Sequence, residues 1–123
     1  MAVSSATVPG SFIGTTVIED TDSDNTPEDA SGSGGTLHQV YIDNSANSAQ
    51  VYVKLYEAAK GSVTVGTTPP SFIFPCPASK AKQFNFASGA AWSTALSFAT
   101  VTAAGTGGNT GPTDSVIVRL TIG

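Results

Sequence analysis

Short segments in which apolar and polar residues alternate are the feature that most constrains the fold of this chain. In Gln50–Glu57, Val51, Val53 and Leu55 fall on one side of an extended backbone, and polar or aromatic residues fall on the other. Ser115–Ile122 repeats the pattern near the end of the sequence. Successive side chains of a β-strand point to opposite faces of a sheet, so this alternation indicates strands with one buried face.

From residue 37 onward, roughly seven to nine such segments follow one another, separated by turns rich in Gly, Pro, Asn and Ser. Gly66–Pro70 is predicted to be a rigid turn, and Val63–Val65 before it a short strand. Short strands at this spacing are typical of antiparallel sandwiches and jelly rolls. We therefore predict an all-β fold, an antiparallel β-sandwich or jelly-roll-like domain, with residues 37–123 as its body.

Residues 1–36 have a different character and are predicted to form an extended N-terminal arm with an acidic linker. Ser11–Ile18 is short and apolar, whereas Glu19–Gly35 is acidic, rich in Gly and Ser, and contains Pro27. Such a composition is typical of a linker or a long loop. We expect the arm to dock on its own body or on a neighbouring subunit. Its predicted anchors are Phe12, Ile13, Val17 and Ile18.

The charge of the chain argues against several classes of partner. Charged residues make up 11% of the 123 residues, the net charge is −4, and the sequence contains no basic stripe for nucleic-acid phosphates. The start lacks the basic and apolar regions of a secretory signal, and no run is long enough to span a membrane. We expect synthesis in the cytoplasm and neither a nucleic-acid nor a membrane partner. A surface with few long charged side chains also loses little entropy when a partner covers it.

The residues that usually carry chemistry are few. His38 is the single histidine and Cys76 the single cysteine, so no disulfide within the chain is possible. A lone histidine in an alternating strand is usually a packing or surface residue, and Cys76 between two prolines is expected to be a buried, inert thiol. We therefore predict no catalytic site, no cofactor and no metal centre. An enzyme would require residues shared between copies across an interface.

Two weaker patterns leave alternatives open. Asp20, Asp22 and Asp24 have the spacing that begins a calcium loop, but Asn25 and Ser31 stand where Gly and Glu are needed. A solvated acidic linker is the favoured interpretation, with weak calcium binding as the alternative.

The aromatic residues give the second open pattern, because aromatic faces stack on sugar rings. They could form a sugar-binding platform, although covering a sheet or lining a subunit contact is the favoured role. The residues concerned are Tyr41, Tyr52, Tyr56 and Trp92.

Four segments, taken in order, resemble a known class of protein. They are Val51–Ala58, Val63–Ser79, Phe84–Gly107 and Asp114–Ile122, with the motifs KLY, VGTT-P, STALSFA and V-RL at their centres. The set resembles small structural proteins of tailed bacteriophages, including those that infect cyanobacteria. The resemblance covers about residues 37–122 and implies a β-sandwich protein of the virion.

Among the members of this class, some decorate capsids and others belong to tail or neck appendages, and the resemblance does not separate these locations. Our leading hypothesis is a capsid cement, or decoration, protein. Copies would bind the outer surface of the major capsid protein, bridge capsomers and associate as dimers or trimers on symmetry axes. The alternative is a tail, neck or fibre component whose Thr102–Asp114 loop and tyrosine face contact host glycan.

Overall fold

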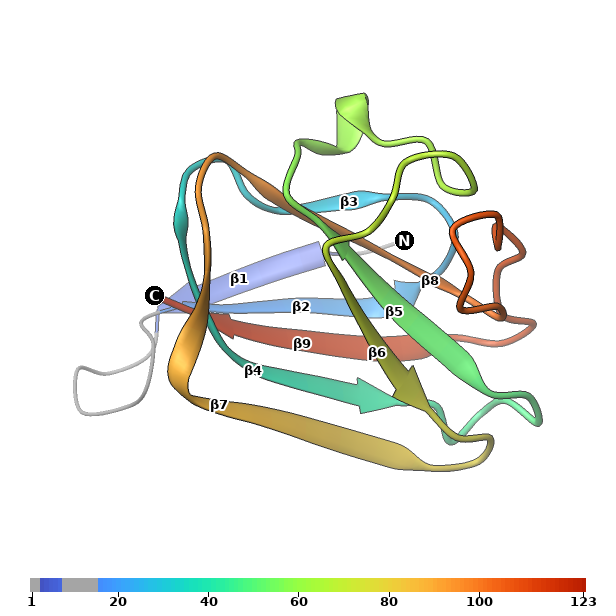
Figure 1. Cartoon of the computed structure of the whole chain (residues 1–123). Helices are drawn as coiled ribbons and strands as arrows, with labels where there is room; N and C mark the ends of the chain where they lie inside the picture. Colours follow the sequence, from blue (N-terminus) through green and yellow to red (C-terminus); the bar gives the residue numbers. More distant parts are fainter. Residues whose placement is uncertain (1–2, 8–15) are drawn as a thin grey trace.

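Two antiparallel β-sheets pack face to face in the computed structural model, which describes residues 3–7 and 16–123 (Figure 1). The five-stranded sheet has, in spatial order, β1 (Val3–Thr7), β2 (Thr16–Ser23), β9 (Val116–Ile122), β4 (Gly35–Asp43) and β7 (Ala81–Trp92). The four-stranded sheet has β3 (Glu28–Ser31), β8 (Leu96–Val101), β5 (Val51–Tyr56) and β6 (Phe72–Cys76). A short 3-10 turn, η1 (Lys60–Ser62), lies between β5 and β6. The predicted all-β antiparallel sandwich is thus confirmed.

The pairing of the strands is that of a jelly roll. Strand β5 pairs with β6, β4 with β7, β3 with β8, and β2 with β9. These four pairs follow one another along one long antiparallel hairpin. The hairpin is folded so that successive pairs lie alternately in the two sheets. An eight-stranded double-sheet jelly roll has this arrangement, and β1 extends one sheet by a further strand.

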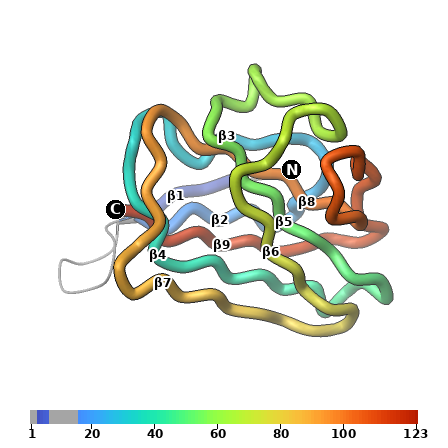
Figure 2. The backbone as a smooth tube through the Cα atoms, in the orientation of Figure 1, coloured from blue at the N-terminus to red at the C-terminus, as the bar shows by residue number. Residues whose placement is uncertain are grey.

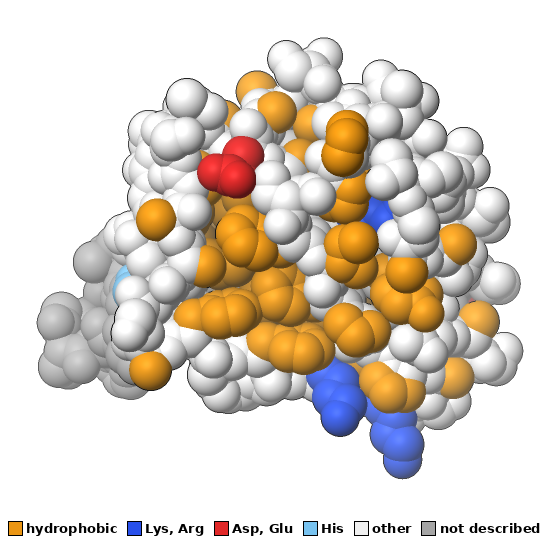
Figure 3. All heavy atoms as spheres, viewed as in Figure 1, with side chains coloured by type: hydrophobic (Ala, Val, Ile, Leu, Met, Phe, Trp, Pro, Cys, Tyr) orange, Lys and Arg blue, Asp and Glu red, His pale blue; other side chains and the backbone are white. Residues whose placement is uncertain are grey.

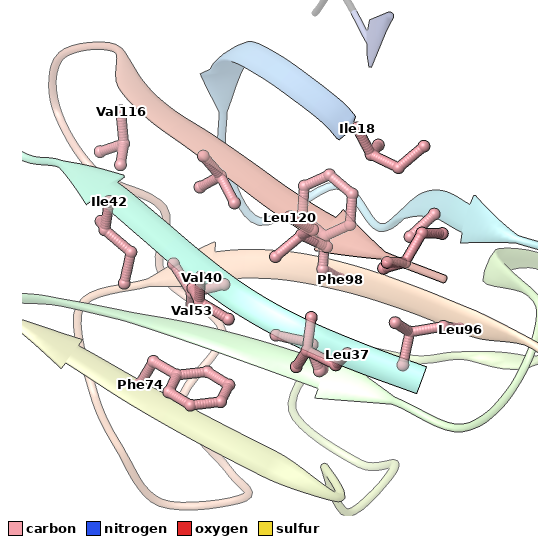
Figure 4. Packing of buried hydrophobic residues seen from close by; sticks show 14 of the residues in the cluster. Ile18, Leu37, Val40, Ile42, Val53, Phe74, Leu96, Phe98, Val116 and Leu120 are labelled. Atoms are coloured by element: carbon pink, nitrogen blue, oxygen red, sulfur yellow. The ribbon is translucent and has the colours of Figure 1, made fainter. Parts of the chain in front are cut away.

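The core lies between the two sheets and consists of the apolar half of each alternating strand (Figure 4). In β9 the buried positions are Val116, Val118, Leu120 and Ile122, which matches the alternation in the sequence. Each apolar side chain removed from water in this way contributes about 1.5 to 3 kcal/mol. The sandwich is therefore held together mainly by the faces that the sequence pattern identifies.

The prediction that Glu19–Gly35 forms a linker or long loop is wrong, because most of this segment is paired in the sheets. Strand β2 pairs with β9, and β3 pairs with β8. Ile18 and Ala30 also belong to the core. The sandwich therefore begins no later than Thr16, and residue 36 does not separate an arm from the sheets.

Polar side chains at inward-facing positions explain this error. Asp20 and Ser23 of β2 are buried, and the Ser23 hydroxyl lies 2.7 Å from that of Thr100 in β8. Backbone pairing does not require apolar side chains, so a strand with a polar interior face escapes a search for alternation.

The short strand predicted at Val63–Val65 is also absent. These residues follow η1, and Val63 packs with Tyr56 and Ala99 in a small second cluster.

Candidate binding surfaces

The structure describes two of the four predicted arm anchors, Val17 and Ile18. Phe12 and Ile13 lie outside the described residues. Val17 is half-buried in β2 and pairs with Thr121 of β9, and Ile18 is 5% exposed within the chain's own core. In this fold Ile18 stabilises its own sandwich and offers no side chain to a partner.

Cys76 is a buried free thiol in β6, as expected. Its Sγ lies 3.4 Å from the carbonyl oxygen of Lys80, and burial raises the pKa of the thiol. A raised pKa leaves little thiolate, the reactive form, at neutral pH.

The acidic run contains one unusual group, the carboxyl of Asp20. This residue is 0% exposed, and its Oδ1 accepts a hydrogen bond of 3.0 Å from the backbone N–H of Asp22. Burial, together with the charges of Glu28, Asp24 and Asp22, raises the pKa of Asp20 to about 6. Among the described residues, no group of three or more His, Cys, Asp or Glu side chains is arranged to hold a metal ion.

The four aromatic residues do not form one platform. Tyr56 is 1% exposed and Trp92 is 5% exposed, and the Trp92 indole N–H donates to the carbonyl of Ser33 at 2.8 Å. Tyr41 lies in the five-stranded sheet with Trp92, whereas Tyr52 and Tyr56 lie in the four-stranded sheet. The Tyr41 ring is beneath the guanidinium of Arg119, which is 5.1 Å from the ring centroid. A sugar-binding face made of these residues is therefore excluded for this fold.

The outer face of the four-stranded sheet is covered by the chain itself. Lys54 of β5 is 0% exposed, and its Nζ donates to the carbonyls of Gly105 (2.6 Å) and Gly108 (3.1 Å) in the loop between β8 and β9. Desolvation lowers the pKa of this lysine. The loop that the sequence marks as Gly-rich is thus attached to the sheet by a buried ammonium group.

A second loop, between β5 and β6, completes this cover (Figure 2). A Cβ added at Gly66 of that loop would lie 3.0 Å from the side chain of Asn109 in the first, so the two loops touch. Together they bury Tyr56 and Ala99 of the sheet beneath them.

An apolar surface remains where the two sheets end side by side, at edge strands β6 and β7. Phe74 lies 5.2 Å from Phe84 and 5.7 Å from Phe86, measured between ring centroids, and 6.4 Å from Phe72. Phe72, Phe84 and Phe86 are only partly buried. We call these four residues the phenylalanine face, and Figure 3 shows a band of hydrophobic side chains across this side of the molecule.

The phenylalanine face is bordered by basic residues. Ile73 of β6 is 41% exposed, but it alternates with Phe72 and Phe74 and points to the other side of the strand. Lys80 and Lys82, both exposed, lie where the chain passes from β6 into β7. Figure 3 shows basic side chains along one border of the hydrophobic band. This surface can therefore accept an apolar partner that carries acidic groups beside its contact.

A small cavity of about 280 Å³ lies on the five-stranded sheet, where β4, β7 and β9 run side by side. We call it the His38 pocket. Its lining is His38, Gln39, Asn85, Phe86, Ala87 and Thr121. Sequence reasoning singled out His38 only as a lone histidine, because residues from three separate strands come together here through pairing alone.

Comparisons of this chain with known protein families, with curated proteins and with solved structures found no match. Among the described residues, no helix is long and apolar enough to cross a membrane.

Proposed function

We propose that this chain is a structural protein of a bacteriophage particle, acting as a capsid cement protein on the outer surface of the major capsid protein. The order of the four motifs from Val51 to Ile122 supports the virion assignment. The phenylalanine face is the observation that carries the docking role, because three of its rings are only partly buried by the chain itself. Exposed apolar patches of this kind on soluble proteins usually mark interaction sites.

The charge beside the face indicates what kind of surface it contacts. In a two-fold contact of the face with itself whose axis passes near Lys80 and Lys82, these residues would approach their own copies and repel them. A partner that places carboxylates there instead gains from the same charges. We therefore assign the face to an acidic border on the capsid protein, and dimers or trimers would form through other surfaces.

The strength of such a cement comes from repetition. One docked copy buries a modest apolar area, but many identical sites on a closed shell act together. A pre-formed sandwich also loses less entropy on docking than a segment that must first fold. Bridging then requires only that each copy contact two capsomers.

The test is binding to purified capsids that lack the protein, with the double variant Phe84→Ser and Phe86→Ser. We expect at least a tenfold loss of affinity, since each ring contributes part of the buried apolar area. Gln83→Ser, on the same strand but on the polar side, is the matched control. Because Phe84 and Phe86 also touch the core, the thermal stability of each variant is measured beside its affinity, so that loss of contact is separated from misfolding.

Charge reversal at the border gives an independent readout. Lys80→Glu with Lys82→Glu is expected to weaken capsid binding and to reverse the effect of added salt on it. Capsid binding that is unchanged in all these variants would overturn the docking role of the phenylalanine face.

The predicted arm anchors need a revised test. Removing residues 1–18 would delete part of β2 and the core residue Ile18, so loss of binding would report misfolding. Phe12→Ser with Ile13→Ser leaves β2 intact. If the arm contributes to docking, this variant binds capsids more weakly while its thermal stability is unchanged.

A second candidate function is a tail, neck or fibre component that contacts host glycan. The observation that favours it is the His38 pocket, since glycan recognition needs a cavity with neutral polar groups and the covered sheet offers no aromatic platform. The position of the chain in the intact particle separates the two candidates.

A further inference from the structure

The His38 pocket is built by an irregularity in β4 that affects both of its neighbours. On the β9 side, Leu37 pairs with Ile122 and Gln39 pairs with Thr121, which leaves His38 as one extra residue. Such β-bulges re-aim a side chain and are frequent beside functional sites.

On the β7 side the irregularity is larger. Leu37 pairs with Ala90 and Gln39 with Asn85, so residues 86–89 of β7 all fall opposite His38. This excursion ends at Gly89, which has a φ of +76°. The strand therefore leaves the plane of the ladder and forms a wall of the pocket with Phe86 and Ala87.

Gly89 also fixes the imidazole of His38. A Cβ at this position would lie 2.1 Å from Cγ2 of Thr36 and 3.4 Å from Nδ1 of His38. A side chain at this position would therefore collide with Thr36 and contact the ring. Nδ1 is buried and has no hydrogen-bond partner among the described residues.

The amides beside the ring leave one donor and one acceptor for a ligand. Oδ1 of Asn85 accepts from Nε2 of Gln39 at 3.0 Å and from Nε2 of Gln83 at 3.2 Å. Nδ2 of Asn85 and Oε1 of Gln39 make no further hydrogen bond with the described part of the chain. The hydroxyl of Thr121 lies in the same lining.

The charge of the lining limits the ligand to neutral molecules. None of the six lining residues is Asp, Glu, Lys or Arg. A carboxylate or phosphate would lose its hydration here without gaining a counter-charge. Phe86 and Ala87 add an apolar wall, so the ligand combines an apolar face with neutral hydroxyl or amide groups.

We propose that the His38 pocket binds a single neutral pyranose ring, the terminal sugar of a glycan. Neighbouring hydroxyls of such a ring would accept a hydrogen bond from the Asn85 amide and donate one to the Gln39 carbonyl, and its C–H face would pack on Phe86. The volume of about 280 Å³ lies at the low end of ligand cavities, which suits one ring. This inference deepens the second candidate function and rests on it, and the pocket shares Phe86 with the phenylalanine face.

The experiment is saturation-transfer NMR of the full chain with glucose, galactose, mannose and N-acetylglucosamine, each titrated through the millimolar range. We expect transfer to at least one of them and a shift of the His38 ring protons on titration. N-acetylneuraminic acid, which is negatively charged, serves as the comparison and is expected to bind at least tenfold more weakly.

Variants locate the binding. Asn85→Ala and Thr121→Val are expected to weaken it about tenfold, the value of one lost hydrogen bond. Thr67→Ala, at an exposed position in the loop between β5 and β6, is the control and should keep binding within about twofold. Thr121→Val retains the β-branched shape, so it separates loss of contact from misfolding. No transfer to any neutral sugar, or binding that both Asn85→Ala and Thr121→Val leave unchanged, would overturn the proposal. Neither result would bear on capsid binding.

Discussion

Strands β8 and β9 lie in opposite sheets and differ in how far their outward-facing side chains are exposed to solvent. All six residues of β8 are buried, whereas β9 alternates between buried and more exposed positions. The difference comes from two loops that cover the four-stranded sheet and leave the five-stranded sheet uncovered by them. Lys54, 0% exposed, and Arg119, whose side chain is 45% exposed, show the contrast in two basic residues.

This comparison separates the sheet that the chain's own loops cover from the sheet that they leave open. The covered sheet adds a second small core around Tyr56, Val63 and Ala99. The uncovered sheet carries polar pairs, such as Arg119 with Glu19, and the His38 pocket. The surfaces that we propose for partners therefore lie on the uncovered sheet and at the β6–β7 edge.

The largest stability effect is expected from a glycine of the uncovered sheet. Gly89→Ala forces a side chain into a left-handed conformation and against Thr36, which should lower the free energy of unfolding by about 3 kcal/mol. Gly107→Ala, in the loop that covers the other sheet, meets nothing within 4 Å and should change it by less than about 0.5 kcal/mol. Urea denaturation of both variants measures the difference. Equal effects would show that the β7 excursion is not fixed by Gly89.

A pH effect is expected from Asp20, which lies between the two sheets. Its pKa is about 6 in the folded chain against 3.8 for an unperturbed aspartate, so the folded state binds a proton more readily than the unfolded state. The contribution of Asp20 to stability is fully present below about pH 4 and is lost as the pH rises through about 6. Relative to Asp20→Asn, the wild type should lose about 2 kcal/mol between pH 4 and pH 7. Denaturation curves at four pH values test this, and a constant difference between the two proteins would contradict it.

A smaller effect separates the two basic residues of the opening comparison. Lys54→Met keeps the buried stem but leaves the carbonyls of Gly105 and Gly108 without a donor, which should cost about 1.5 kcal/mol. Arg119→Met removes an exposed pair with Glu19 and should cost less than about 1 kcal/mol. Hydrogen exchange should accelerate in residues 102–113 for Lys54→Met alone. Faster exchange there in Arg119→Met as well would show that the loop is held by other contacts.

Much of the fold could be predicted from the sequence, because a sandwich strand with one apolar face carries its own signature. Val116 to Ile122 shows this signature and forms β9 as expected. Strands β2 and β3 could not be predicted in the same way. Their interior positions include Asp20 and Ser23, and their place is fixed by backbone pairing with strands far away in the chain.

The candidate surfaces were less predictable than the fold. Alternation places Phe84 and Phe86 on one face but does not say that β7 is an edge strand beside β6. The same pattern places Lys54 outside the core, where a lysine is usually solvated. Its burial depends on a loop fifty residues away in the chain, which no local pattern records.

A cryo-electron microscopy map of the particle that contains this chain tests the central claim most directly. The account predicts density for the jelly roll on the outside of the capsid shell, with Phe72, Phe84 and Phe86 against the major capsid protein and carboxylates near Lys80 and Lys82. A map in which the chain is absent from the shell, or in which the β6–β7 edge faces solvent, would contradict it.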